Sequence, residues 1–236
     1  MARMISAVFL TVCIFFISAS FAEDQIFLRE DFRSLDNWKP LYFPKIKAHT
    51  IYSIASEGSE SALKAESNAS ASAMVDVKEI DIYKYPKIRW RWKVSNVYTK
   101  AVPGTKDGDD YPIRIYVLFK YDPARLGLME KIKYNAAKVM YGEYPPDSTL
   151  SYVWASRPDS PPVMTSPYTD RAKLIALERG PEKAGQWVEE SVDILQDYRK
   201  AFGIDPPAMA SIAVMNDSDN TGEKSISYVG HIEVFR

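Results

Sequence analysis

Apolar and polar residues alternate along several short segments of the chain, and a period of two is typical of β-strands with one buried face. The clearest segment is Ile-Arg-Trp-Arg-Trp-Lys-Val at 88–94, where every second residue is apolar and the others are cationic. We expect further strands at 27–32, 48–54, 61–65, 71–77, 113–119, 149–155, 172–177, 209–215 and 226–235.

Two segments carry apolar residues at helical spacing instead. The pattern predicts a helix over 126–140, which Gly142 follows, and a second helix over 187–202. Gly203 stands at the position where a glycine commonly ends a helix.

The expected strands are short and do not alternate regularly with helices, which argues against a parallel α/β fold. We predict a single domain over 23–236 that is dominated by β-structure. Its fold is expected to be an antiparallel β-sandwich of jelly-roll or lectin-like type with two helical insertions.

The longest apolar run lies at the beginning of the chain and predicts a cleavable secretory leader. Arg3 precedes the run Ile5–Ile17, and the small residues of Ser20-Phe21-Ala22 follow it. The run is shorter than the roughly 20 residues that a membrane-spanning helix needs. We expect cleavage after Ala22, no membrane anchor afterwards and a periplasmic location, with secretion as the alternative.

Composition narrows the function classes. The chain is 46% hydrophobic and 13% aromatic, which is sufficient for a buried core. Its formal net charge is −1, with both signs interspersed, so nothing resembles the basic face of a nucleic-acid-binding protein. The only cysteine, Cys13, lies in the predicted leader, and the mature chain is expected to fold without disulfides.

An acidic loop at 216–222 has the pattern of a calcium-binding turn. Asp217, Asp219 and Thr221 place oxygen-bearing side chains at alternate positions, and Gly222 follows them. Hard cations such as Ca²⁺ bind several converging oxygens. An EF-hand is excluded because Tyr228 stands where that loop has its bidentate glutamate. A generic Ca²⁺ site and a turn that hydrogen-bonds its own backbone both remain open.

A second acidic loop occupies 106–112. Its carboxylates, which include Asp109 and Asp110, repel one another unless they are solvated, paired or bridged by a cation. Arg114 is placed to pair with Asp110. Each acidic loop follows an expected strand. If those strands run in the same direction, the loops lie at one end of the sandwich and share a site; otherwise each is a solvated loop.

Aromatic residues are the other candidates for a binding surface. We expect the five tryptophans to pack mainly in the core. Four tyrosines lie near proline-rich loops and are candidates for an exposed rim: Tyr141, Tyr144, Tyr152 and Tyr168. The residues predicted to bind a ligand are Asp109, Asp110, Arg114, Tyr152 and Trp154.

Several strings recur in a characteristic order: Ile88–Val94, Asp109–Val117, Leu150–Ser156, Gln186-Trp187, Asp197–Arg199, Ala201–Gly203 and Asp217–Thr221. Together they resemble the bacterial DUF3047 family over about residues 27–236. The family commonly has threonine where this chain has Ser218, a change that keeps the hydroxyl. The resemblance implies an exported, periplasmic, sandwich-like domain and supplies no established activity.

Three functions are compatible with these features. The interpretation we favour is a non-enzymatic envelope protein that binds a ligand, with glycan suggested by analogy to other sandwich folds. The first alternative is a polysaccharide hydrolase or lyase that uses the acidic-loop carboxylates. The second is a structural or assembly partner without a small-molecule site. The histidines are the isolated His49 and His231, and no nucleophile elbow or metalloprotease motif occurs.

Overall fold

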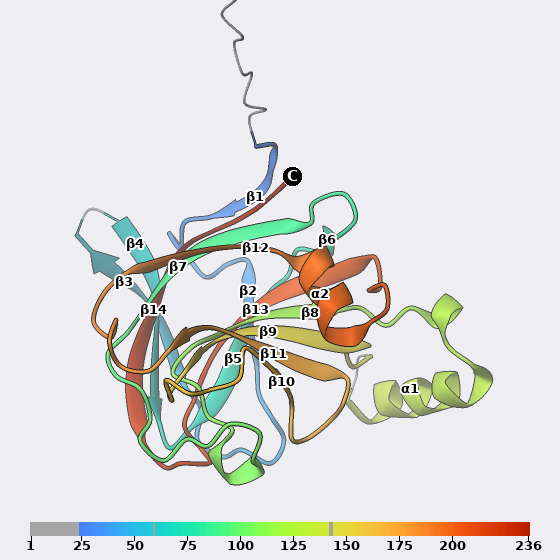
Figure 1. The fold of residues 1–236 in the computed structure, drawn as a ribbon. Helices are drawn as coiled ribbons and strands as arrows, with labels where there is room; N and C mark the ends of the chain where they lie inside the picture. Colours follow the sequence, from blue (N-terminus) through green and yellow to red (C-terminus); the bar gives the residue numbers. More distant parts are fainter. Residues whose placement is uncertain (1–23, 59, 142–143) are drawn as a thin grey trace, which may run out of the picture.

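Two β-sheets packed face to face form the body of the protein (Figure 1). The computed structural model describes residues 24–58, 60–141 and 144–236. The predicted leader, residues 1–22, lies outside the described residues. In the described part of the chain, no helix is long and apolar enough to cross a membrane.

The first sheet has the strand order β12-β7-β14-β4-β3, and β1 pairs with the second half of β14. All of its neighbouring strands run antiparallel. Its strands are β1 (Ile26–Glu30), β3 (Ile51–Glu57), β4 (Glu60–Asn68), β7 (Lys87–Val94), β12 (Val188–Asp193) and β14 (Lys224–Phe235).

The second sheet has the order β10-β11-β9-β8-β13-β5-β2, and β6 pairs with the start of β13. Its strands are β2 (Trp38–Leu41), β5 (Ala71–Asp76), β6 (Ile80–Asp81), β8 (Arg114–Phe119), β9 (Ser148–Ala155), β10 (Val163–Thr165), β11 (Ala172–Arg179) and β13 (Met209–Asp217). Only β9 and β11 pair in parallel among the described strands. The predicted antiparallel sandwich is therefore confirmed, with one parallel pair added.

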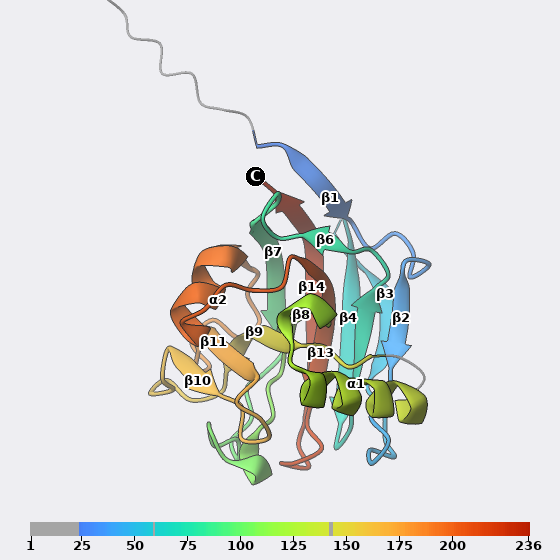
Figure 2. The same ribbon diagram turned by 90° about the vertical axis from the view of Figure 1, so that its right-hand side faces the viewer.

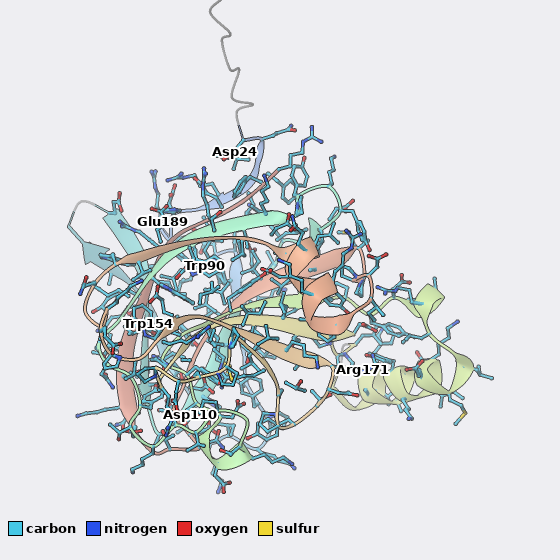
Figure 3. All side chains as sticks on the ribbon, viewed as in Figure 1. Asp24, Trp90, Asp110, Trp154, Arg171 and Glu189 are labelled. Carbon is cyan, nitrogen blue, oxygen red and sulfur yellow. The ribbon has the colours of Figure 1, made fainter. Side chains whose placement is uncertain are left out.

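The core lies between the sheets and follows the alternation of the strands. On β7, Trp90 and Trp92 are fully buried, and they contact Tyr152 and Trp154 of the opposite sheet. Figure 3 shows Trp90 and Trp154 inside the sandwich. Trp187 is the exception to the expected burial of the tryptophans, because it lies under the guanidinium of Arg91 on the outer face of the first sheet.

The predicted helix at 187–202 is wrong in its first half. Residues Val188–Asp193 form the edge strand β12, and α2 spans only Ile194–Phe202. Asp193 ends the strand and begins the helix, since its carboxylate accepts a hydrogen bond from the backbone N–H of Gln196 at 2.9 Å. Gly203 ends the helix in the left-handed region, at φ 71°.

The other predicted helix is confirmed as α1 (Leu128–Tyr141). It stands beside the second sheet rather than between the two sheets, as Figures 1 and 2 show from two directions. Two 3-10 turns complete the structure: η1 (Lys106–Gly108) and η2 (Pro123–Arg125).

Candidate functional site

The two acidic loops lie together at one end of the sandwich. Strands β8 and β13 are antiparallel neighbours, so the loop that precedes β8 and the loop that follows β13 emerge at the same end. Figures 1 and 2 both place the two loops there, and Figure 3 shows Asp110 at this end of the molecule. The shared location is as expected, because the first loop follows β7 and the second follows β13, and both strands end at this end of the sandwich.

Arg114 forms the central ion pair of this cluster with Asp217. Its Nε lies 2.8 Å from Asp217 Oδ1, and its Nη2 donates to Asp217 Oδ2. The guanidinium also donates to the backbone carbonyl of Asp109, whose carboxylate lies 3.6 Å from Nη1. A bidentate pair of this kind fixes the orientation of both side chains.

The expected pair between Arg114 and Asp110 is not formed. Asp110 instead accepts hydrogen bonds from the backbone N–H groups of Thr221, at 2.6 Å, and Asn220, at 3.3 Å. It therefore holds one acidic loop against the turn of the other. Thr221 belongs to the same turn, and its hydroxyl accepts from the backbone of Glu223.

Burial disfavours the charged forms of the carboxyl groups in this cluster and strengthens the interactions between its charges. Asp109, Asp110, Asp217 and Arg114 are each at most 5% exposed. Burial raises the pKa of Asp217 and of Asp109, and the Arg114 guanidinium opposes both shifts. Burial also raises the pKa of Asp219, with a further contribution from the charge of Asp110. The cluster thus contains four carboxyl groups, of which the Arg114 guanidinium contacts those of Asp217 and Asp109.

Three of these carboxylates converge closely enough to share a cation. One oxygen each from Asp110, Asp217 and Asp219 lies within 4.8 Å of the other two. Thr221, the third predicted metal ligand, is not in this group. Asp109 Oδ1 is buried and has no hydrogen-bond partner among the described residues.

Tyr152 and Trp154 do not line a surface. Both side chains are fully buried on the inner face of β9. The Tyr152 hydroxyl donates to Asp197 at 3.1 Å, and the Trp154 indole donates to the carbonyl of Gly180 at 3.0 Å. The burial of Trp154 agrees with the expected core packing of the tryptophans, whereas Tyr152 does not stand on the exposed rim where we expected it, because even-numbered residues of β9 face the core.

A groove on the outer face of the second sheet was not predicted. Its volume is about 1080 Å³, and its floor crosses four adjacent strands through Leu41, Val75, Leu118 and Ser211. Tyrosines stand on both sides of it. Tyr42, which is 56% exposed, follows β2, whereas Tyr121 and Tyr144 flank α1 and have ring centroids 4.6 Å apart. Charged side chains also line it: Lys39, Glu79, Lys120 and Asp122.

Of the four rim tyrosines suggested by the sequence, Tyr144 lines this groove. Tyr168 is exposed beside the acidic loops, where its hydroxyl donates to the carbonyl of Lys106 at 3.2 Å. Tyr152 is buried, and the side chain of Tyr141 lies outside the described residues. Tyr42, on the other side of the groove, was not predicted. The signal that could have indicated it is Tyr42-Phe43-Pro44, two aromatic residues and a proline that directly follow a strand.

The groove and the acidic cluster lie on the same face of the same sheet. Leu118 of the groove and Arg114 of the cluster are four residues apart on β8, which corresponds to about 13 Å. Tyr116 lies between them on that face, and it packs with Met215 of β13. The groove and the charged end therefore share one face of the sheet, and between them Ala71, Ala73 and Met215 are buried under Leu41, Phe43 and Ile46.

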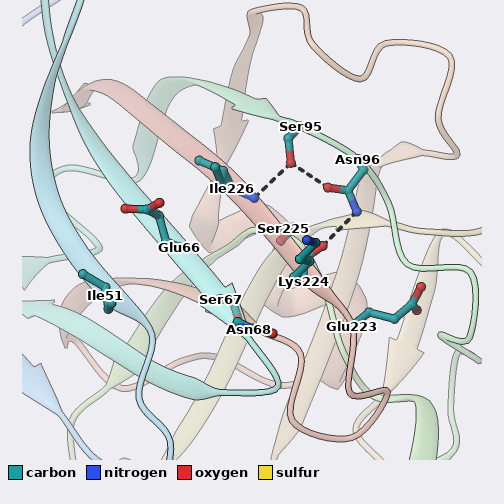
Figure 4. A pocket seen from close by; sticks show the side chains of 10 residues that line it. All are labelled: Ile51, Glu66, Ser67, Asn68, Ser95, Asn96, Glu223, Lys224, Ser225 and Ile226. Atoms are coloured by element: carbon teal, nitrogen blue, oxygen red, sulfur yellow. Dashed lines mark hydrogen bonds between the residues drawn. The ribbon is translucent and has the colours of Figure 1, made fainter.

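A second depression, of about 730 Å³, lies beside β4 and the start of β14 (Figure 4). Its polar groups largely satisfy one another. Ser95 donates to Asn96 and accepts from the backbone of Ile226, and Asn96 donates to the carbonyl of Lys224. These groups are less available to a ligand than those of the tyrosine groove.

Comparison with known proteins identifies the family. Residues 36–233 match the family described as "Protein of unknown function (DUF3047)", and the chain belongs to this family. The resemblance noted in the sequence is thus confirmed. No curated protein matches the chain.

Several solved structures are similar in fold. A family 11 carbohydrate-binding module from Clostridium thermocellum, in complex with a β-1,3-1,4-mixed-linked tetrasaccharide, is 13% identical, with a TM-score of 0.47 and coverage of 91% of this chain and 96% of that chain. A family GH12 endoglucanase 3 from Trichoderma harzianum is 8% identical (TM-score 0.44, coverage 92% and 100%). The winged bean acidic lectin is 10% identical (TM-score 0.37, coverage 91% and 100%).

Proposed function

We propose that the protein is a non-enzymatic glycan-binding module and that the outer face of its second sheet binds the ligand. The observation that carries this proposal is the groove between Tyr42 on one side and Tyr121 and Tyr144 on the other. Aromatic rings present flat apolar faces, on which the C–H face of a sugar ring packs. A groove open to solvent accepts a segment of a longer chain.

The charged residues of the groove suit a polyhydroxylated ligand. Lys39 can donate hydrogen bonds to a ligand and Asp122 can accept them, and Lys120 and Glu79 form an ion pair beside them. The two signs nearly balance, which favours a neutral sugar over a strongly anionic one. A concave site with apolar walls and a few polar groups is the usual form of a small-ligand site.

We also propose that Asp110, Asp217 and Asp219 bind Ca²⁺ at the charged end of this face. Their converging oxygens and the partnerless Asp109 Oδ1 support the proposal. The cation would balance the carboxylates that Arg114 leaves uncompensated and would hold the two acidic loops together. In this role it orders the end of the binding face.

The enzymatic alternative has less support. Asp110 accepts hydrogen bonds from two backbone N–H groups, Asp217 pairs with Arg114, and neither carboxyl group is more than 2% exposed to a polymeric substrate. A general acid or base needs a carboxyl group that reaches the substrate. The location we propose remains the periplasm, reached through the predicted leader.

The proposal is tested by screening the chain from Glu23 to Arg236 against immobilised neutral and acidic oligosaccharides and by sedimentation with purified peptidoglycan. We expect retention by at least one neutral class without release of shortened sugars. Release of products would favour the hydrolase or lyase. Absence of retention on every probe would leave only the structural or assembly role.

A further inference from the structure

The helix α1 presents an apolar stripe to solvent. Leu128, Ile132 and Val139 are 74%, 52% and 88% exposed, and Met129 is 68% exposed. At about 100° per residue, the first three fall within an arc of about 40°, and Met129 widens the stripe to about 100°. Single exposed apolar residues are common on protein surfaces, but a continuous stripe along one helix is not.

The opposite side of the helix holds it to the body of the protein. The Tyr134 ring stacks on Tyr121 at 4.3 Å, and Glu130 accepts from Arg171 at 2.8 Å. Figure 1 shows the helix projecting from the side of the sandwich, and Figure 2 shows it from the front. The anchoring contacts therefore fix which side faces outward.

Cationic side chains border the stripe. Lys131 lies along one edge and Lys133 along the other, whereas Lys138 lies farther round the helix with its Nζ 4.4 Å from the ring centroid of Tyr144. Over residues 123–141 the chain has four cationic side chains, with Arg125 as the fourth, and a single carboxylate, Glu130. That carboxylate is the one turned inward to Arg171. The outward side of the helix is thus apolar at its centre and positive at its margins, in a protein whose net charge is −1.

We infer that α1 binds the surface of an anionic lipid bilayer, lying parallel to the membrane with its apolar stripe inserted at the headgroup boundary. Amphipathic helices of this composition insert to about 5–10 Å, and their lysines pair with anionic headgroups. The charge distribution favours this partner because both margins of the stripe are basic. Binding of one such helix is weak and reversible. The inference is independent of the proposed glycan site.

The test is sedimentation of the chain from Glu23 to Arg236, which lacks the predicted leader, with two kinds of vesicle. One contains phosphatidylglycerol and phosphatidylethanolamine, and the other contains phosphatidylcholine alone. We expect binding to the anionic vesicles only. Raising the NaCl concentration from about 0.1 M to about 1 M shortens the Debye length from about 10 Å to about 3 Å. The higher salt concentration should therefore weaken binding to the anionic vesicles.

Variants assign the binding to α1. The double change Ile132→Asp and Val139→Asp should lower partitioning about tenfold or more, and so should Lys131→Glu with Lys133→Glu. Ile51→Asp is the matched control, because Ile51 is 65% exposed on the first sheet; it should leave partitioning unchanged. The replaced residues are exposed, apart from the half-buried Lys131, and thermal unfolding of each variant verifies that it folds.

Two results would overturn the inference. One is that the wild-type chain does not bind anionic vesicles, or that the variant with both aspartate substitutions binds them as well as the wild-type chain does. The other is self-association of the wild-type chain in sedimentation velocity that is lost in the same variants, which would assign the stripe to a second copy of the protein.

Discussion

Arg114 on β8 and Asp217 on β13 form a two-contact ion pair that is almost completely buried, with Nε and Oδ1 2.8 Å apart. Arg114 is the first residue of β8, and Asp217 is the last residue of the neighbouring strand β13. They also bring the two acidic loops to the same end of the binding face that we propose.

Removing the cation of this pair should strongly destabilise the fold. Arg114→Leu leaves the buried carboxylates without their guanidinium, and breaking a buried pair typically costs about 3–5 kcal/mol. Urea unfolding at neutral pH measures the loss. Arg157→Leu is the control, since its pair with Asp159 is exposed and should contribute about 1 kcal/mol or less. Equal losses for the two variants would show that the buried pair has no special role.

Asn216 should be a second strong determinant of stability, because it connects the two sheets. Its amide nitrogen donates to the Ala65 carbonyl and to Ser227, and its oxygen accepts from Tyr98 and Ser225. Asn216→Leu leaves these groups unsatisfied, at a cost of about 2–3 kcal/mol in urea unfolding. The exposed Asn96→Ala should cost much less. A loss below about 1 kcal/mol for Asn216→Leu would contradict the predicted role.

Glu190 should make stability depend on pH. It lies opposite Trp90 on the inner side of β12, and burial, with the nearby charge of Glu178, raises its pKa from 4.5 to about 7. The folded state favours the protonated form of Glu190. The contribution of this group to the free energy of unfolding is therefore fully present below pH 4.5 and is lost as the pH rises through about 7. Glu190→Gln keeps the group neutral and should lessen the loss of stability between about pH 5 and about pH 8.

Thermal unfolding at the two pH values checks this prediction. The exposed Glu182→Gln provides a matched control and should follow the wild-type protein at both. The assignment would be wrong if Glu190→Gln kept the wild-type difference between the two pH values.

Calcium should raise the melting temperature of the protein if the carboxylate cluster binds it. A ligand at 100 times its dissociation constant contributes about 2.7 kcal/mol. Asp219→Asn should abolish the rise, since Asp219 is the least buried member of the cluster and its replacement disturbs the fold least. The same protein in EDTA supplies the reference, and Asp170→Asn supplies an exposed control. A rise that persists in Asp219→Asn would place the cation elsewhere.

Strand alternation predicted the fold class and the buried face of β7, because each depends on a local pattern. The pattern was ambiguous at β12, where Val188 and Val192 are spaced equally well for a strand or a helix. Pairing with β7 decided between them. The same periodicity, applied to β9, would have placed Tyr152 and Trp154 in the core.

The candidate site was harder to predict because its parts are distant in the sequence. The acidic loops were recognisable individually, but the partner of Arg114 depends on the register of β8 against β13. The groove combines Tyr42, Tyr121 and Tyr144 from three separate connections. No local pattern places these rings opposite one another.

The most direct test of the proposed function is isothermal titration of groove variants with the oligosaccharide best retained in the screen. Tyr42→Ala and Tyr144→Ala should each weaken binding about tenfold, which corresponds to about 1.4 kcal/mol. Tyr228→Ala, on the first sheet against Trp187, is the control and should bind as the wild-type protein does. Affinity that is unchanged in both groove variants would show that the glycan binds elsewhere and would contradict the account.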